Sequence, residues 1–202
     1  MKSRVVFELA ADEPQTQGLR DMQCLFARAC NALAPVVQAQ RLWHRVALHH
    51  AQYHALRAQF PELGSQLVCN VIYAVSKSAR VLFQSPQSPF YLARLGDKPL
   101  PLMRFSDDSP VYFDRHTLSL KAGRLSMFTL DGRMKFDLPI SAKQEAYLQQ
   151  VKLSEVLLSG TPQQGYRLTF VCVPQGAPSV RLASRTANAE SVPEHVALED
   201  VK

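Results

Sequence analysis

A single predicted β-strand opens this chain, and a long helical region separates it from all the other predicted strands. Residues 3–10 are mostly apolar and β-branched, as is typical of a strand. Asp12 and Pro14 then end the strand and begin a helix, with acidic residues where the helix dipole favours them. An isolated strand would leave its backbone groups unpaired. We therefore expect residues 3–10 to pair with strands that follow much later in the sequence.

Three helical segments follow, each with an apolar stripe at three- and four-residue steps. The first stripe consists of Leu19, Met22, Phe26, Cys30 and Leu33. Pro35 then breaks the pattern or begins the next helix. The second stripe, which Pro61 ends, consists of Leu42, Val46, His49, Tyr53, Leu56 and Phe60. The third lies between a predicted N-cap at Ser65 and Gln84 and consists of Val68, Val71, Ile72, Val75, Ala79 and Leu82. Each stripe needs an apolar partner, which predicts a three-helix bundle.

From Ser85 onward the sequence is typical of an all-β region. Short strands are predicted at 102–105, 111–114, 118–121, 125–130, 134–138, 153–158 and 166–173. Ala122-Gly123 and Asp131-Gly132 lie between paired runs and predict hairpins. Ser141 is a predicted cap for a short helix that ends near Gln150.

The order of these elements predicts an α+β protein. Residues 1–13 and 90–175 would form a β-barrel or strongly curved sheet, because the N-terminal strand must join the later ones. Residues 14–84 would then be an inserted helical bundle. Residues 176–202 show neither helical nor strand periodicity and are predicted to be a flexible or loosely docked tail.

Composition narrows the class of protein. The 202-residue chain is 47% hydrophobic, so one or two packed cores are expected rather than wholesale disorder. The longest apolar run is far short of the ~20 residues that span a bilayer, and no secretory signal opens the chain. Four cysteines occur without a C-x-x-C pair. These features predict a cytoplasmic protein with reduced cysteines and no membrane association.

The residues offer no evident active site. Phosphate-binding loops, dinucleotide fingerprints and nucleophile elbows are absent. His50 and His54 have the i, i+4 spacing of helical metal pairs, but Ala51 stands where such a motif has Glu, and no third ligand is evident. Asp107 and Asp108 fall in a predicted solvated turn. We therefore predict no catalytic residue, no metal and no cofactor.

Positive charge is the main functional signal. The net charge is +6 and the sequence pI is about 9.3, which is compatible with nucleic acid but also common without it. Guanidinium groups contact phosphates bidentately, and aromatic rings stack on unpaired bases. One candidate set lies in the second helical segment and consists of Arg41, Trp43, Arg45 and Arg57. A second lies near the predicted hairpins and consists of Arg115, Lys121, Arg124, Arg133 and Lys135. A packing role for the tryptophan and ordinary solubilising charge for the cations remain open alternatives.

Several segments match one known family in the right order. Residues 11–15 and 19–33 resemble its opening, and residues 53–72 resemble its next helical segment. The clearest match is Ser109-Pro-Val-Tyr-Phe-Asp-Arg-His-Thr-Leu-Ser-Leu-Lys, followed by residues 124–133, and residues 152–158 and 165–171 resemble a closing hairpin. Over residues 5–173 the chain resembles the N-terminal region of TnpB-type transposon-encoded RNA-guided nucleases and related type V CRISPR effectors.

The resemblance implies a wedge β-barrel with an inserted recognition lobe. In the family these modules cradle scaffold RNA and the guide–target duplex and help to read a flanking DNA motif. The match adds Lys77 and Arg80 in the lobe to the candidate nucleic-acid-binding residues. The family continues into a RuvC-like nuclease domain that opens with Asp-x-Gly, whereas this chain continues from Gln175 into Gly-Ala-Pro-Ser and ends at Lys202. Nuclease activity is therefore not carried over, and we do not expect an enzyme.

The expected function is that of an RNA-binding subunit of an RNA-guided complex. Its partner would be guide or scaffold RNA. Further possible partners are target DNA and a separate nuclease or effector subunit. Two alternatives stay open: a protein-interaction or structural module that kept the fold and lost RNA binding, and a transposon-derived remnant or truncation. The discriminating feature is whether the candidate cations converge on one continuous face.

Overall fold

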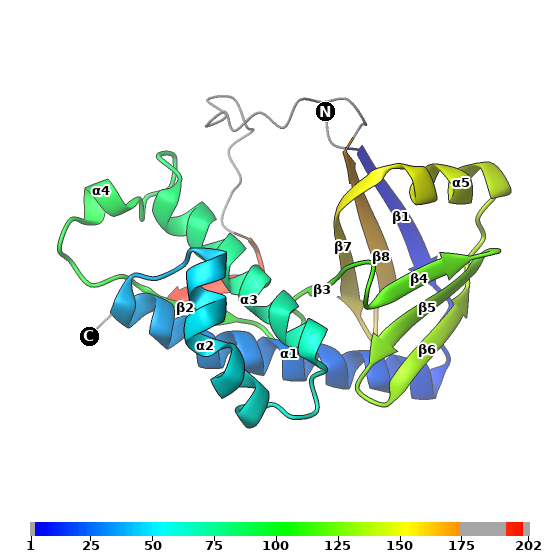
Figure 1. Ribbon diagram of the computed structural model, residues 1–202, viewed down its shortest axis with the longest axis horizontal. Helices are drawn as coiled ribbons and strands as arrows, with labels where there is room; N and C mark the ends of the chain where they lie inside the picture. The colour runs from blue at the N-terminus through cyan, green and yellow to red at the C-terminus, as the bar shows by residue number, and fades with distance from the viewer. Residues whose placement is uncertain (1–2, 174–192, 200–202) are drawn as a thin grey trace. The chain divides into compact units, whose positions relative to one another are not determined.

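The computed structural model describes residues 3–173 and 193–199 and shows an α+β protein with antiparallel sheets (Figure 1). The described residues divide into two units. The first unit contains residues 3–23 and 110–173, and the second contains residues 24–109 and 193–199. No helix in these described ranges is long and apolar enough to cross a membrane.

The N-terminal strand belongs to a four-stranded antiparallel sheet in the first unit. Its strand order is β1-β8-β7-β3, with bounds Ser3–Leu9, Gly165–Val173, Lys152–Thr161 and Val111–Phe113. β1 pairs along its whole length with β8, from Ser3 opposite Cys172 to Leu9 opposite Tyr166. The expectation that the first strand joins strands from the far end of the chain is confirmed. Phe7 of β1 and Phe170 of β8 meet edge to face in the core of this unit.

A second antiparallel sheet of the first unit is built from two hairpins. It has the order β4-β5-β6, with bounds Leu118–Lys121, Arg124–Thr129 and Gly132–Asp137. Both predicted turns are confirmed, because Ala122-Gly123 joins β4 to β5 and Asp131-Gly132 joins β5 to β6. Among the described residues the strands form separate antiparallel sheets and no closed barrel.

A short helix, α5 (Ala142–Gln150), follows the hairpins. Ser141 is its N-cap, as predicted, and a full capping box forms with Gln144. The Ser141 Oγ accepts a hydrogen bond from the Gln144 backbone N–H at 3.3 Å, and Gln144 Oε1 accepts one from the Ser141 N–H at 3.0 Å. These bonds satisfy two of the donors that every helix start leaves unpaired.

The first helix, α1 (Glu13–Gln40), is longer than predicted. Its predicted apolar stripe from Leu19 to Leu33 is buried, which confirms the helical period. Pro35 neither ends the helix nor begins another, so that expectation is wrong. A proline inside a helix costs about 3 kcal/mol. Val37 beyond it is fully buried, as are neighbouring residues before it, and this packing keeps the helix continuous.

The core of the second unit centres on α3 (Ser65–Ala79). Its predicted stripe is buried, and the chain continues as the π-helical turn η1 (Arg80–Gln84). The N-cap is Gly64, so the prediction of Ser65 as cap is wrong by one residue. α2 (Arg45–Gln59) packs against α3 through Leu48 and Leu56. The predicted stripe of α2 is therefore partly wrong: Val46, one of its members, is 56% exposed.

The end of the chain contributes a strand to the second unit. β9 (Val196–Glu199) pairs with β2 (Leu102–Phe105), a strand that the sequence had placed with the barrel. Of the two alternatives predicted for residues 176–202, the flexible tail is wrong for this segment, because it is docked on the edge of β2 and Val196 is buried. Residues 176–192 and 200–202 lie outside the described residues.

Two further contacts hold β2 in the second unit. The side chain of Asn31 on α1 accepts a hydrogen bond from the Phe105 N–H at 2.8 Å and donates one to the Phe105 carbonyl at 2.9 Å. Arg104 forms an ion pair with Glu199 of β9 at 3.0 Å. A short helical turn, α4 (Leu92–Leu95), lies between η1 and β2 in the chain.

Candidate nucleic-acid interface

The β4-β5-β6 sheet has one buried and one exposed face. Leu125, Met127 and Phe136 are buried, whereas the residues that alternate with them are exposed or half-buried. Directly paired residues of antiparallel strands share a face. The register therefore gathers eight side chains on the exposed face, which we call the cationic sheet face: Ser119, Lys121, Arg124, Ser126, Phe128, Arg133, Lys135 and Asp137.

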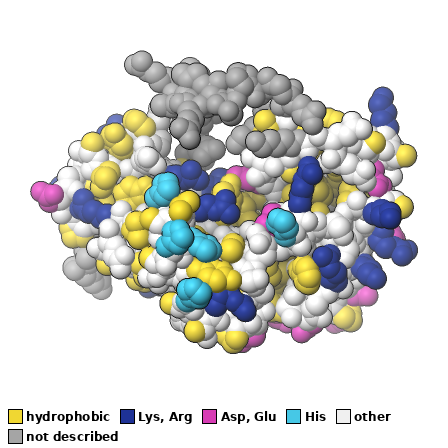
Figure 2. Space-filling view, in the orientation of Figure 1, with side chains coloured by type: hydrophobic (Ala, Val, Ile, Leu, Met, Phe, Trp, Pro, Cys, Tyr) yellow, Lys and Arg dark blue, Asp and Glu magenta, His cyan; other side chains and the backbone are white. Residues whose placement is uncertain are grey.

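This face brings together four of the five cations predicted in the β region. Lys121 pairs with Arg124 across β4 and β5, and Lys135 lies opposite Ser126. Four cations and the single carboxylate of Asp137 give the face a net charge of +3. Lys121 and Lys135 have no ion-pair partner within residues 3–173 and 193–199. Figure 2 shows Lys and Arg side chains gathered over the part of the molecule that the three strands occupy.

An exposed aromatic ring lies among these cations. Phe128 is 40% exposed, and the guanidinium of Arg133 lies over its ring at 4.1 Å from the centroid. The same guanidinium is 3.2 Å from the Ser126 Oγ, to which it donates a hydrogen bond. An arginine over a ring is attracted by the ring's quadrupole, so this pair is held in a defined orientation.

The ion pair between Arg124 and Asp137 is exposed to solvent. Their atoms are 3.2 Å apart, but the two side chains are 67% and 83% exposed. An exposed pair of this kind contributes about 0–1 kcal/mol and is screened by salt. Arg124 is therefore available to a phosphate at little cost.

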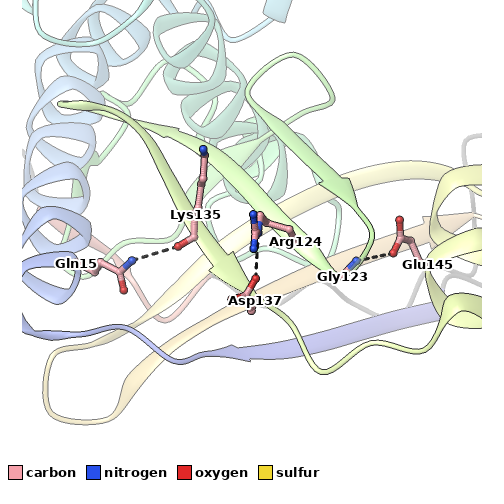
Figure 3. Close-up of polar contacts among 6 residues, drawn as sticks. All are labelled: Gln15, Gly123, Arg124, Lys135, Asp137 and Glu145. Carbon is pink, nitrogen blue, oxygen red and sulfur yellow. Dashed lines mark hydrogen bonds and ion pairs between the residues drawn. The ribbon is translucent and has the colours of Figure 1, made fainter.

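Three contacts outside the sheet fix its geometry, as Figure 3 shows in part. The Gln15 side chain at the start of α1 donates a hydrogen bond to the Lys135 carbonyl at 3.2 Å. The Glu145 carboxylate of α5 accepts hydrogen bonds from the N–H groups of Ala122 and Gly123, at 2.7 and 2.8 Å. Gly18 lets α1 approach β6 closely, because a Cβ there would lie 3.1 Å from the Met134 Cε. The sheet that carries the cationic sheet face is thus held by contacts with α1 and α5.

Arg115, the fifth cation predicted in the β region, is not part of this face. It follows β3 and donates a hydrogen bond to the Val151 carbonyl at 2.9 Å. It also lines a cavity of about 230 Å³ together with apolar residues such as Leu118, Leu148 and Phe170.

Three of the residues predicted in the helical region have structural roles. Arg41 donates hydrogen bonds to the carbonyls of Gly96 and Lys98, at 2.8 and 2.7 Å. Arg57 donates to the Leu63 carbonyl, at the end of the loop between α2 and α3. The Trp43 ring packs on Phe83 with 5.6 Å between centroids, which agrees with a packing anchor.

The remaining helical cations are placed separately. Arg45 is exposed and lies over the Tyr73 ring, 5.0 Å from its centroid. Arg80 is exposed at the start of η1. Lys77 is half-buried and acts electrostatically on His195. The structure therefore offers Arg45 and Arg80 as accessible cations of the second unit.

Phe128 is one of four members of the cationic sheet face that we did not predict as site residues, together with Ser119, Ser126 and Asp137. The signal was present, since Arg124, Ser126 and Phe128 alternate with the apolar Leu125 and Met127. Because side chains alternate along a strand, Arg124, Ser126 and Phe128 are expected on the solvent-exposed face. A large aromatic side chain on a solvent-exposed strand face breaks the expected polar pattern and therefore indicates a binding role.

The described residues show no metal-binding group of three His, Cys, Asp or Glu side chains. Figure 2 shows histidine side chains gathered over α2, and two of them, His50 and His54, are exposed. Asp108 accepts a hydrogen bond from Ser106 Oγ within the turn that precedes β3. Comparison with known proteins finds no matching family model and no matching curated protein.

Proposed function

We propose that this chain is the RNA-binding subunit of an RNA-guided, TnpB- or type V-like complex that targets nucleic acid. It binds structured guide RNA, can extend to flanking DNA, and does not itself cleave. The single observation that carries the proposal is the cationic sheet face, where four cations and the exposed ring of Phe128 share one face of the sheet.

The chemistry of this face suits RNA better than a generic anion. Arg124 and Arg133 can each contact a phosphate bidentately, and Lys121 and Lys135 add point charges. The Phe128 ring can stack on an unpaired base, which sequence-tolerant RNA-binding surfaces commonly use. The hydroxyls of Ser119 and Ser126 can bond to phosphate or to the 2′-hydroxyl. In such a complex the sequence is read by base pairing, and the protein contributes phosphate neutralisation and shape recognition.

The proposal includes an architecture. The first unit would correspond to the wedge module and the second to the inserted recognition lobe. Arg45 and Arg80, which are exposed in the second unit, would add phosphate contacts to the same RNA. Support comes from the order of the resembling segments and from the N-terminal strand that joins β8.

The first test is to purify the full chain from its host and to sequence the RNA that survives a moderate-salt wash. A single discrete structured RNA supports the proposal. Protein without RNA, or a mixture of ribosomal fragments lost as salt rises, contradicts it.

The second test uses two matched double variants in the first unit. Lys121→Gln/Lys135→Gln removes two cations from the cationic sheet face, and Arg4→Gln/Lys143→Gln removes two exposed cations elsewhere. The slope of log K against log salt should become shallower by about 1.5 for the first variant, because each phosphate contact contributes roughly 0.7 to 0.9. The second variant should keep the wild-type slope. Equal effects of the two variants would show that the face is not the binding surface.

A protein-interaction module is the second candidate, and a specific feature favours it. β1 is an edge strand of the four-stranded sheet, and its Val6 side chain is 50% exposed. A strand edge of this kind can accept a strand from another chain. A partner that wild type retains and Val6→Lys loses, with no RNA bound by either, would favour this candidate.

A further inference from the structure

A cysteine and a histidine lie within hydrogen-bonding distance of each other in the second unit. The Cys69 Sγ on α3 is 3.7 Å from the His49 Nε2 on α2. Both residues are half-buried. Neither residue belongs to the cationic sheet face, so this pair calls for a separate explanation.

The imidazole of His49 is held in place by its neighbours. Its ring stacks on Tyr53 with 4.8 Å between centroids and 21° between planes. The ring of His50 meets it edge-on at 5.9 Å. In this arrangement Nε2 of His49 faces the Cys69 sulfur.

Neither of the two helices that carry the pair contains an acidic residue. α2 and α3 contain the basic residues Arg45, Arg57 and Lys77. Reactive cysteines occur in partly exposed, electropositive environments, often beside an imidazole that stabilises the thiolate. Two of the other three thiols differ: Cys30 and Cys172 are buried, and burial raises the pKa of each.

We propose that Cys69 and His49 form a thiol-modification site that reacts with small disulfides. His49 Nε2 takes the proton of the Cys69 thiol, and the thiolate attacks one sulfur of the disulfide. A bond forms between Cys69 Sγ and that sulfur as the original S–S bond breaks. The second half leaves as a thiolate and takes the proton from the imidazolium. Cys69 is oxidised to a mixed disulfide, and the released half is reduced to a thiol.

The test is the rate of reaction of the whole folded chain with dithiodipyridine at about pH 6, with each cysteine followed by peptide mass spectrometry. Cys69 should react about tenfold faster than Cys24, the other half-buried thiol, because the imidazole of His49 lies beside its sulfur and can accept its proton. Since this comparison is made within the wild-type protein, it does not depend on any variant folding.

A pair of histidine variants then identifies the base. His49→Gln should remove most of the rate advantage of Cys69, because Nε2 of His49 is the atom that faces the sulfur. His44→Gln should leave it unchanged, because His44 is exposed at the start of α2 and its side chain makes no capping hydrogen bond. Equal rates for Cys69 and Cys24 in wild type would overturn the proposal. So would equal effects of the two histidine variants when thermal unfolding shows that both are folded.

Discussion

The guanidinium of Arg133 lies 4.1 Å above the centroid of the Phe128 ring, and the two residues occupy paired positions of β6 and β5. The pair forms part of the exposed face of a sheet whose other face is packed. It places a planar cation and a planar aromatic ring together where solvent reaches both. Such a pair offers an incoming base a stacking surface and an incoming phosphate a charged donor.

Replacing Phe128 should separate stacking from charge. Phe128→Ala is expected to weaken binding to RNA with unpaired bases by about five- to 150-fold, the equivalent of 1–3 kcal/mol per stacked base. Binding to a fully paired duplex should change little, because its bases are not accessible for stacking. Fluorescence anisotropy with a looped and a duplex RNA of equal length measures the difference.

Tyr147→Ala is the matched control for this variant, since Tyr147 is 46% exposed on α5 of the same unit. It should bind both RNAs as wild type does. An equal loss on both RNAs for Phe128→Ala would mean that the ring only positions Arg133.

Removing the carboxylate of the cationic sheet face should strengthen RNA binding. Asp137→Asn frees Arg124 from its ion pair and raises the net charge of the face by one. We expect a gain of about two- to fivefold in affinity at low salt that shrinks at high salt, as for other exposed charges. Binding isotherms at two salt concentrations test this. A loss of affinity would show that Asp137 is needed to orient Arg124.

The contact between Glu145 and the β4–β5 turn should contribute to stability. Glu145→Ala removes the carboxylate that accepts from the Ala122 and Gly123 N–H groups and is expected to cost about 1–2 kcal/mol of unfolding free energy. Urea denaturation measures the loss. Glu8→Ala, an exposed carboxylate on β1, should cost less than about 0.5 kcal/mol.

The same turn contains a residue in a strained backbone conformation. Ala122 has a φ of 53°, a region that disfavours residues with a Cβ. Ala122→Gly should therefore stabilise the protein by about 0.5 kcal/mol, after the added entropy of the unfolded chain is subtracted. Ala55→Gly on the exposed side of α2 should instead destabilise it by about 1 kcal/mol. If both variants are destabilising, the strain at Ala122 is negligible.

The docking of the 193–199 segment should depend on pH through His195. Burial lowers the pKa of His195, Asp108 and Glu194 act to raise it, and Lys77 acts to lower it. His195 therefore binds a proton more strongly when the segment is undocked or unfolded than when it is docked. The neutral side chain stabilises docking fully above the ordinary histidine pKa of about 6.5. This stabilisation is lost as pH falls from there through the lower pKa of the folded state.

Amide exchange at Ser106 reports this docking, since its N–H donates to the His195 carbonyl at 3.0 Å. Its protection, corrected for intrinsic exchange, should fall as pH drops below about 6.5. His195→Phe should make the protection independent of pH. Protection that rises with falling pH in wild type would contradict the expected direction.

Local patterns were enough to predict most helices and hairpins. The stripe from Leu19 to Leu33 is buried on α1, and Asp131-Gly132 makes the turn between β5 and β6. The four cations of the cationic sheet face were also named as candidates, in one set with Arg115 near the predicted hairpins. Their convergence was not predicted, because it depends on the register of β4, β5 and β6 rather than on any one segment.

Tertiary structure decided what local patterns left open. The sequence by itself determined an α+β chain whose N-terminal strand needs a distant partner, because strand and helix periods and turn residues are local properties. Packing alone decided that α1 continues through Pro35 and that α2 buries Leu48 instead of Val46. The strand β9 formed only because β2 offered an edge. Burial and strand pairing join residues far apart in the chain, and their free energy outweighs propensities of about 1–3 kcal/mol.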